Sequence, residues 1–244
     1  MIKAYAKSDI GKVREKNQDS YYISDSLSQV QLYMLADGMG GYKGGEIASS
    51  LAIQSAKNYI ENNFKEIEKD RDSIIQLVGS SIEYANMVVY EKSKESKELE
   101  GMGTTLEVCL IYNNKVYIGH VGDSRVYRIR KEFTRKLTQD HSYVQKLVKD
   151  GTITKEEAKH HPQKNMLMKA LGCNAFVEPD VMVKGFLKED ILIINSDGLT
   201  NLVSQEEIFR EAKKDIEQAP KELVRIANEN GGYDNITVIV IKNI

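Results

Sequence analysis

The chain places its strand-like segments in consecutive runs and its helix-like segments in pairs, and this grouping limits the folds open to it. Two long segments with helical spacing, 44–63 and 71–95, follow a first group of strands, and two more, 204–214 and 220–230, precede the last strand. Alternating βαβ units would space strands and helices one by one, so this order favours antiparallel sheets covered by helices. The segments expected to be strands are 2–8, 20–24, 30–36, 104–112, 115–121, 124–130, 134–138, 177–186, 190–196 and 236–242.

Helix starts carry signals of their own. Short helices are expected at 142–149 and 154–160. The second opens with the capping box Thr154-x-x-Glu157, and segment 204–214 opens with Ser204-x-x-Glu207. In such a box each side chain bonds the other residue's backbone N–H, which fixes the first helical turn.

Length and charge narrow the possible functions. The chain has 244 residues, with 34 Lys and Arg, 36 Asp and Glu, and a formal net charge of −2. A chain of this length buries roughly 70–75% of its unfolded surface, so one large domain over residues 1–244 is expected. Without an excess of basic residues, neither nucleic acid nor an anionic membrane is a favoured partner.

The sequence indicates a cytoplasmic protein. The N-terminal segment has no apolar signal-peptide core. The longest apolar runs, such as 191–194, are far too short to span a bilayer. Cys109 and Cys173 form no CxxC pair, so neither a disulfide scaffold nor a thiolate metal site is expected.

Four aspartates lie where strands begin or end. Asp37 and Asp197 each follow an apolar strand and precede a glycine. Asp123 lies between two strands, and Asp234 comes just before the last one. If the last strand runs opposite to the strands before Asp37 and Asp197, these three acids reach the same edge of the sheet. Any single one could be only a turn residue, because Asp-Gly and Asp-Asn are common in turns.

Carboxylates gathered at one edge need a compensating charge. At about 5 Å and an effective dielectric constant near 20, each pair costs roughly 3 kcal/mol. Either the pKa values rise or a cation lies among the acids. Mg²⁺ and Mn²⁺ suit a site built from carboxylate and carbonyl oxygens. A zinc pattern is missing, since there is no HExxH and the adjacent His160 and His161 face different ways.

The glycine-rich segment 37–45 has a second interpretation, as a phosphate-binding loop. It follows a strand and precedes a helix, but it contains neither G-x-G-x-x-G in register nor G-x-x-x-x-G-K-[ST]. An acid at the loop entrance would also repel phosphate unless a metal intervened. The glycines are expected instead to let backbone carbonyls approach a metal closely.

Seven short motifs in sequence order resemble those of the type 2C metal-dependent serine/threonine protein phosphatases, especially the compact bacterial form. One motif would be weak evidence for this, whereas seven in order over essentially the whole chain are highly specific. The motifs are Arg14-x-x-Asn17-Gln18-Asp19, Asp37-Gly38-Met39-Gly40-Gly41, Gly103-Thr104-Thr105, Gly122-Asp123-Ser124-Arg125, Asp140-His141-Ser142, Ser196-Asp197-Gly198 and Asp234-Asn235.

The resemblance implies an α+β fold, a four-layer α/β/β/α sandwich of two antiparallel sheets flanked by helix pairs, with a mobile flap insert near 142–171. It implies hydrolysis of phosphoserine and phosphothreonine by a hydroxide that bridges two Mn²⁺ or Mg²⁺ ions, with room for a third ion. Asp37 would bridge both core ions, and the Gly38 carbonyl would bind one of them. Asp197 and Asp234 would bind the other, and Asp123 would bind the third.

Two further residues complete the site that the resemblance implies. Arg14 would bind the substrate phosphate, because its planar guanidinium matches two phosphate oxygens. Asp19 would support the site through water or hydrogen bonds, since Gln18 stands where the family often has an acid. Tyr42 stands where many bacterial members have a histidine, so the proton for the leaving group is expected from metal-bound water or from His161.

Two alternatives stay open at this point. A non-catalytic binding module on the same fold would be marked by lost metal ligands, and Asp37, Asp197 and Asp234 are all present. The second alternative is a phosphatase for small phosphorylated molecules. The sequence does not distinguish it from a protein phosphatase, because the sequence of the flap does not indicate which substrates the flap accepts. The expected partners are phosphoproteins and an opposing serine/threonine kinase, and the expected state is a monomer.

Overall fold

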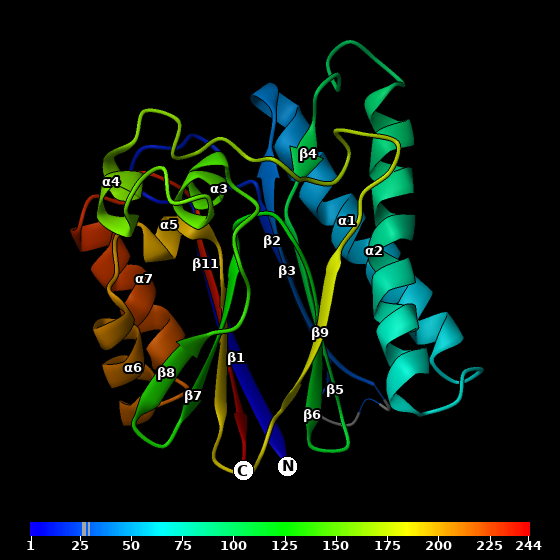
Figure 1. Ribbon diagram of the computed structural model, residues 1–244, viewed down its shortest axis with the longest axis vertical. Helices are drawn as coiled ribbons and strands as arrows, with labels where there is room; N and C mark the ends of the chain where they lie inside the picture. The colour runs from blue at the N-terminus through cyan, green and yellow to red at the C-terminus, as the bar shows by residue number, and fades with distance from the viewer. Residues whose placement is uncertain (26–27, 29) are drawn as a thin grey trace.

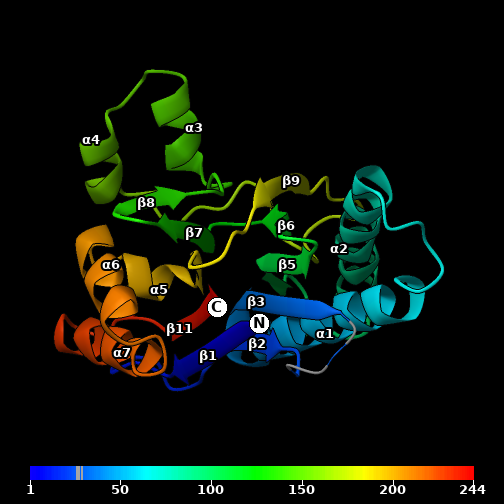
Figure 2. The same ribbon diagram turned by 90° about the horizontal axis from the view of Figure 1, so that it is seen from below.

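The structure, a computed structural model, describes residues 1–25, 28 and 30–244, and only the backbone of residues 41–43. Two antiparallel sheets pack face to face, and helices cover both outer faces (Figures 1 and 2). The four layers therefore run helix, sheet, sheet, helix. This confirms the predicted fold class.

The strands divide between two sheets that we call sheet A and sheet B. Sheet A has the order β1-β11-β10-β7-β8, and sheet B has the order β2-β3-β5-β6-β9, with β4 paired to β3. Sheet A contains β1 (Ile2–Asp9), β7 (Arg125–Arg130), β8 (Phe133–Lys136), β10 (Ile191–Asn195) and β11 (Ile236–Asn243). Sheet B contains β2 (Asp19–Ile23), β3 (Gln31–Met39), β4 (Gly103–Thr104), β5 (Leu106–Tyr112), β6 (Lys115–Val121) and β9 (Asp180–Gly185).

The central strands are apolar on both faces because each face is covered. Every residue of β10 is buried, and so are the first six of β5. One face of each strand contacts helices and the other contacts the opposing sheet, which explains their continuous apolar runs. The edge strand β8 has no buried residue.

The helices pack as one group on each sheet. On sheet B lie α1 (Gly41–Asn63) and α2 (Arg71–Ser93), and on sheet A lie α5 (Asp197–Thr200), α6 (Gln205–Lys214) and α7 (Ala219–Glu229). Three apolar clusters result: one under α1 and α2, one under α6 and α7, and one between the sheets. Fully buried members of the cluster between the sheets include Leu35, Ile118, Leu192, Ile194 and Ile239.

Residues 142–171 leave sheet A after β8 and project away from the sandwich (Figure 2). They contain α3 (Tyr143–Lys149) and α4 (Lys155–His160), and α4 begins with the predicted capping box. The segment returns beside its own start, where the Tyr143 amide donates to Met166 O at 2.8 Å. In the described part of the chain, no helix is long and apolar enough to cross a bilayer.

The sequence missed two short elements. Helix α5 has four residues, too few for a helical period to be visible. Strand β4 has two residues, Gly103 and Thr104, and it forms because Thr104 pairs with Gly38 on β3. The predicted strand at 177–186 is shorter in the structure, from Asp180 to Gly185.

The interface between the sheets predicts a specific loss of stability. Ile194→Ala, at a side chain with no exposed surface, should lower the free energy of unfolding by about 2–5 kcal/mol, because it removes buried methyl groups and leaves a cavity. Urea unfolding measures this. Phe133→Ala, at a side chain 78% exposed, is the control and should change stability by less than about 0.5 kcal/mol. A similar small effect at Ile194 would contradict a closely packed interface.

Candidate functional site

The predicted acids gather at one end of the sandwich, but they come from both sheets. Asp197 follows β10 and Asp234 precedes β11, and these strands are antiparallel, so the two acids share an edge as predicted. The prediction that Asp37 lies on the edge of the same sheet is wrong. Asp37 belongs to β3 of sheet B, and β3 continues to Met39 because Gly38 and Met39 pair with β4.

The electrostatics of Asp37 show how closely the acids are gathered. Removal from water raises the pKa of Asp37 well above its ordinary value, and the charges of four other aspartates raise it further. The pKa of Asp197 is raised by burial and then by Asp234. Burial also raises the pKa values of Asp19 and Asp123 to about 7. The cluster therefore stores repulsion that a bound cation would offset.

The donor set fits a hard divalent cation. It consists of carboxylate oxygens, which Mg²⁺ and Mn²⁺ prefer. In addition, Asp19 Oδ1 is buried and has no hydrogen-bond partner among the described residues. A buried polar atom of this kind needs water or an ion. Among the described residues, no three His, Cys, Asp or Glu side chains are arranged as a group that could hold an ion.

Hydroxyl groups fix the backbone of Asp37. Its N–H donates to Thr105 Oγ1 at 2.9 Å. Its carbonyl oxygen accepts from the Thr104 hydroxyl and from the Thr105 amide, each at 2.9 Å. Thr105 Oγ1 also lies 2.8 Å from Ser124 Oγ. The Gly103-Thr104-Thr105 motif, for which the sequence suggested no role, therefore positions Asp37.

The glycines after Asp37 and Asp197 are required by packing. A Cβ atom at Gly38 would lie 2.1 Å from the Gly45 carbonyl oxygen at the start of α1. One at Gly198 would lie 2.1 Å from Asn235 O. The backbone thus approaches other backbone too closely for any side chain. The sequence left open that each of these aspartates, taken alone, is only a turn residue. The close backbone packing at both Asp-Gly pairs argues against that alternative.

Asp19 joins the two sheets beside Asp37. It pairs directly with Asp37 across β2 and β3. Its Oδ2 accepts from Ser196 Oγ at 2.9 Å, and Ser196 Oγ in turn accepts from the Thr237 amide at 3.0 Å. Asp19 therefore lies within the acid cluster itself. The sequence analysis expected it to support the site through water or hydrogen bonds.

Arg14 contacts the acid cluster through Asp234. Its Nη2 donates to Asp234 Oδ2 at 2.8 Å, and its Nε lies 2.8 Å from Oδ1, so both carboxylate oxygens are engaged. Arg14 is half exposed, with 52% of its side-chain surface open to solvent. The planar fork predicted to hold phosphate thus holds a predicted metal ligand in this structure.

Asn235 fixes the loop that carries Arg14. Its Oδ1 accepts from the Gln18 amide at 2.8 Å. Its Nδ2 donates to the carbonyl oxygens of Ile10 and Lys16, both at 2.9 Å. No role was predicted for Asn235 from the sequence. Its position next to Asp234 in a recognised motif was the sequence signal that could have indicated one.

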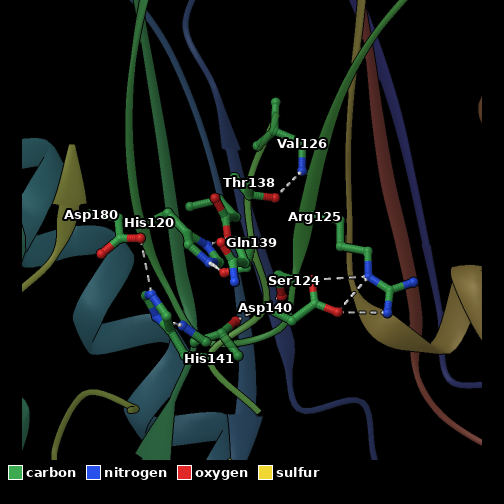
Figure 3. A network of polar contacts seen from close by, with 12 residues as sticks. His120, Ser124, Arg125, Val126, Thr138, Gln139, Asp140, His141 and Asp180 are labelled. Carbon is green, nitrogen blue, oxygen red and sulfur yellow. Dashed lines mark hydrogen bonds and ion pairs between the residues drawn. The ribbon is translucent and has the colours of Figure 1, made fainter. Parts of the chain in front are cut away.

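Asp123 lies in the turn between β6 and β7. Arg125, two residues further on, binds Asp140 through Nε and Nη2, at 3.1 and 2.7 Å from Oδ2 (Figure 3). Lys136 also contacts Asp140, at 3.0 Å. Asp140, a motif residue without an assigned role, therefore balances Arg125.

His161 is the side chain that was predicted, besides metal-bound water, as a source of the proton for the leaving group. His161 Nδ1 accepts from the Gln163 amide at 3.1 Å, and the ring lies 6.2 Å from that of Tyr143, so its contacts are local to residues 142–171. The side chain of Tyr42 lies outside the described residues.

A cavity of about 570 Å³ lies far from these acids. It is lined by Arg130 and Ile191, which are at the opposite ends of β7 and β10 from the acid cluster. None of the predicted site residues lines it. The chemistry of the acid cluster therefore does not involve this cavity.

Comparison with known proteins gives consistent matches over the whole chain. The family model "Protein phosphatase 2C" matches residues 12–232. A protein from Streptococcus pyogenes named "Putative protein phosphatase 2C-type" is 37% identical over 99% of this chain and 98% of that protein. The serine/threonine phosphatase Stp1 from Staphylococcus aureus is 36% identical, with a TM-score of 0.92 over 100% of this chain and 96% of that chain.

One of the similar structures contains metal. It is the catalytic domain of the serine/threonine protein phosphatase PstP in complex with two manganese ions. This chain is similar to it with 33% identity and a TM-score of 0.86, over 99% of this chain and 97% of that chain.

The raised carboxyl pKa values predict a pH dependence of stability without metal. Asp19 and Asp123 have pKa values of about 7 when folded, against 3.8 as the ordinary value. Between these values the folded state binds more protons than the unfolded state, so stability falls as pH rises through about 7. We expect a loss on the order of 2 kcal/mol between about pH 5 and pH 8 in EDTA, since partial solvent exposure weakens the effect.

Urea unfolding at each pH measures this loss, and Asp123→Asn provides the comparison. The variant should show a smaller loss than the wild-type chain, because its side chain does not ionise. Added Mn²⁺ should restore the wild-type stability at about pH 8. Equal pH profiles for the two chains would contradict the assignment of Asp123 to the cluster.

Proposed function

This chain belongs to the protein phosphatase 2C family of metal-dependent serine/threonine protein phosphatases, and we propose that it hydrolyses phosphoserine and phosphothreonine in proteins with two Mn²⁺ or Mg²⁺ ions at the acid cluster. The observation that carries this proposal is the gathering of four other aspartates from two sheets around Asp37, whose pKa is raised by burial and by the charges of those four. Carboxylates so arranged are stabilised by divalent cations.

We assign the metal ligands by their place in the cluster. Asp37 is central, since the charges of all the other acids act on it, and this suits a bridging position between two ions. The Gly38 carbonyl is assigned to one ion, and Asp197 and Asp234 are assigned to the other. Asp123, from the turn between β6 and β7, is assigned to a third. When bound, such ions lower the pKa of a coordinated water and offset the charge that develops on phosphate.

Arg14 and Asp234 have linked roles in this proposal. An ion at Asp234 would compete with the guanidinium for the carboxylate oxygens, so Arg14 is expected to exchange Asp234 for two oxygens of the substrate phosphate. The exposure of Arg14 leaves its fork accessible for that exchange. A bidentate contact would orient the phosphate as well as bind it.

Asp19 supports the site from the neighbouring strand. Its Oδ2 is fixed by Ser196, while its buried Oδ1 has no partner among the described residues. We assign to Oδ1 the role of accepting a hydrogen bond from water in the site. A water held there lies beside Asp37, because the two residues pair across β2 and β3.

The remaining features of the proposal concern the whole chain. We propose that residues 1–244 act as one catalytic domain and that residues 142–171 form its flap. We propose a cytoplasmic monomer that acts on phosphoproteins, opposes a serine/threonine kinase, and binds neither nucleic acid nor membranes. The near-zero net charge of −2 supports the last point.

The direct test is phosphate release from a phosphothreonine peptide with Mn²⁺, with Mg²⁺ and with EDTA. We expect release that needs a metal and stops in EDTA. A small phosphate ester, assayed in parallel, should be a much poorer substrate. Preference for the ester would favour a small-molecule phosphatase, and no release from folded protein under any metal would favour a binding module.

Asp37→Asn should reduce kcat by at least about 100-fold, because it removes the central negative charge while changing little volume. The circular dichroism spectrum should stay as in the wild-type chain. Asp72→Asn, on an exposed side chain of α2, is the control and should have normal kcat. Normal turnover by Asp37→Asn would exclude the two-ion assignment.

Arg14→Ala should raise KM for the phosphopeptide about tenfold or more, with a smaller change in kcat. A charge-assisted hydrogen bond contributes about 1.5–3 kcal/mol, and a factor of ten corresponds to 1.4 kcal/mol. Arg71→Ala, on exposed α2, is the matched control. An unchanged KM would remove Arg14 from the phosphate site.

A further inference from the structure

One residue holds both backbone polar groups of Gly122, directly before Asp123. The His141 amide donates to Gly122 O at 2.7 Å. The Gly122 amide donates to His141 Nδ1 at 3.2 Å. On its other side Gly122 lies against Thr105, whose Cγ2 would be 2.5 Å from a Cβ atom there, and its φ of +115° suits only glycine. The position of the turn that carries Asp123 therefore depends on His141.

The bond from Gly122 fixes the tautomer of His141. Because Nδ1 accepts a hydrogen bond, it carries no proton, and the neutral ring carries its proton on Nε2. Nε2 lies 3.3 Å from Asp180 Oδ2 on β9, as Figure 3 shows. Burial and the neighbouring His120 lower the pKa of His141, which favours the neutral ring. The ring thus connects Gly122 to a neighbouring strand with one defined orientation.

A row of polar side chains, buried at Glu107 and His120, supports the ring. His141 stacks on His120 with ring centroids 4.5 Å apart (Figure 3). His120 is fully buried between Glu107, which contacts its Nδ1, and Gln139 O, which lies 2.8 Å from its Nε2. Glu107, His120 and Asp180 face one another across β5, β6 and β9. His141 cannot shift without disturbing this row.

His141 also lies where the two ends of the proposed flap meet. Its carbonyl oxygen accepts from the Met168 amide at 2.7 Å. The next residue, Ser142, pairs with Leu167. Lys169 Nζ lies 3.8 Å from Asp180 Oδ1, on the carboxylate that His141 contacts. The backbone of His141 therefore joins the turn before Asp123 to the segment 142–171.

We propose that His141 is a positioning residue that, through the Gly122 amide, sets how the Asp123 carboxylate is presented to the third ion. The proposal rests on the proposed function in one respect, the assignment of Asp123 as a ligand. His141 itself binds neither ion nor substrate. The His141 amide holds the Gly122–Asp123 peptide through the Gly122 carbonyl, and the ring fixes the preceding Val121–Gly122 peptide through the Gly122 N–H.

Two substitutions separate the contacts of the ring. In His141→Asn the amide oxygen takes the place of Nδ1 and can accept from Gly122, but the side chain does not reach Asp180. In His141→Gln the longer amide reaches toward Asp180 and leaves the Gly122 N–H without its acceptor. Both variants keep the backbone bonds to Gly122 and Met168. His160→Gln, on a side chain 81% exposed, is the matched control.

The first readout is amide hydrogen exchange in the metal-free protein. We expect the Gly122 amide to exchange about tenfold faster or more in His141→Gln, because one hydrogen bond of about 1.4 kcal/mol is lost. His141→Asn and the control should protect this amide as the wild-type chain does. Wild-type protection of Gly122 in His141→Gln overturns the proposal.

The second readout is Mn²⁺ binding by calorimetry, with phosphopeptide kinetics alongside. One Mn²⁺ binding step should be abolished by Asp123→Asn, and His141→Gln should weaken that same step by about tenfold while leaving the other binding steps unchanged. In the kinetic assay, His141→Gln should lower kcat more than it raises KM. His141→Asn should restore both. Adding His141→Gln to Asp123→Asn should cause no further loss, because the two residues act as one unit. If His141→Asn is as impaired as His141→Gln, the residue is only structural and the proposal fails.

The outcomes also distinguish this proposal from the proposed function. A wild-type chain without an Asp123-dependent binding step overturns the third-ion assignment and this proposal with it. A chain that binds the ions as expected but releases no phosphate overturns the proposed function alone. In that case the exchange and calorimetry results still decide the role of His141.

Discussion

Carboxylates that repel one another are held together at one end of this molecule because the apolar interface between the sheets fixes the strand ends that carry them. Leu35 and Ile194 are buried in that interface, each two or three residues from a site acid. Shifting either strand by one residue would exchange the side chains that face the opposing sheet with those that face the helices, and would move the acid with them. Packing energy therefore offsets the repulsion until a cation does so.

Around the acids, small polar side chains determine where each backbone lies. Thr105 holds the Asp37 amide, Ser196 holds the Asp19 carboxylate, and Asn235 holds the loop that carries Arg14. His141 does the same for the turn before Asp123. Most of these bonds connect segments far apart in the chain, so the site is rigid only when both sheets are in place. A preorganised site of this kind suits chemistry that depends on positioning and charge.

The Arg14–Asp234 pair links charge balance to substrate binding. In the structure the guanidinium neutralises an acid that is assigned to a metal. An ion at Asp234 would take over that role and free a planar cation next to the place where phosphate binds. The same positive charge would thus serve the acid cluster first and the substrate afterwards.

Much of the fold could be predicted from sequence because its signals are local. Apolar runs identified the buried strands, and the side chains of Ser204 and Glu207 set the start of α6 through a predicted capping box. The motifs also identified the acids that gather at one end. What the sequence left open depended on long-range contacts: Asp37 was assigned to the wrong sheet, and α5 and β4 were too short to have a period.

The amino-acid sequence by itself thus determined which residues are acidic, which segments are buried and where most helices begin, since these follow from side-chain type and spacing. Only the tertiary structure decided that Thr105, Asn235 and His141 position the acids and that Arg14 binds Asp234. Those partners lie 68, 217, 19 and 220 residues apart along the chain. Such pairs are selected by the pairing of distant strands and the packing of the two sheets, which no local pattern encodes.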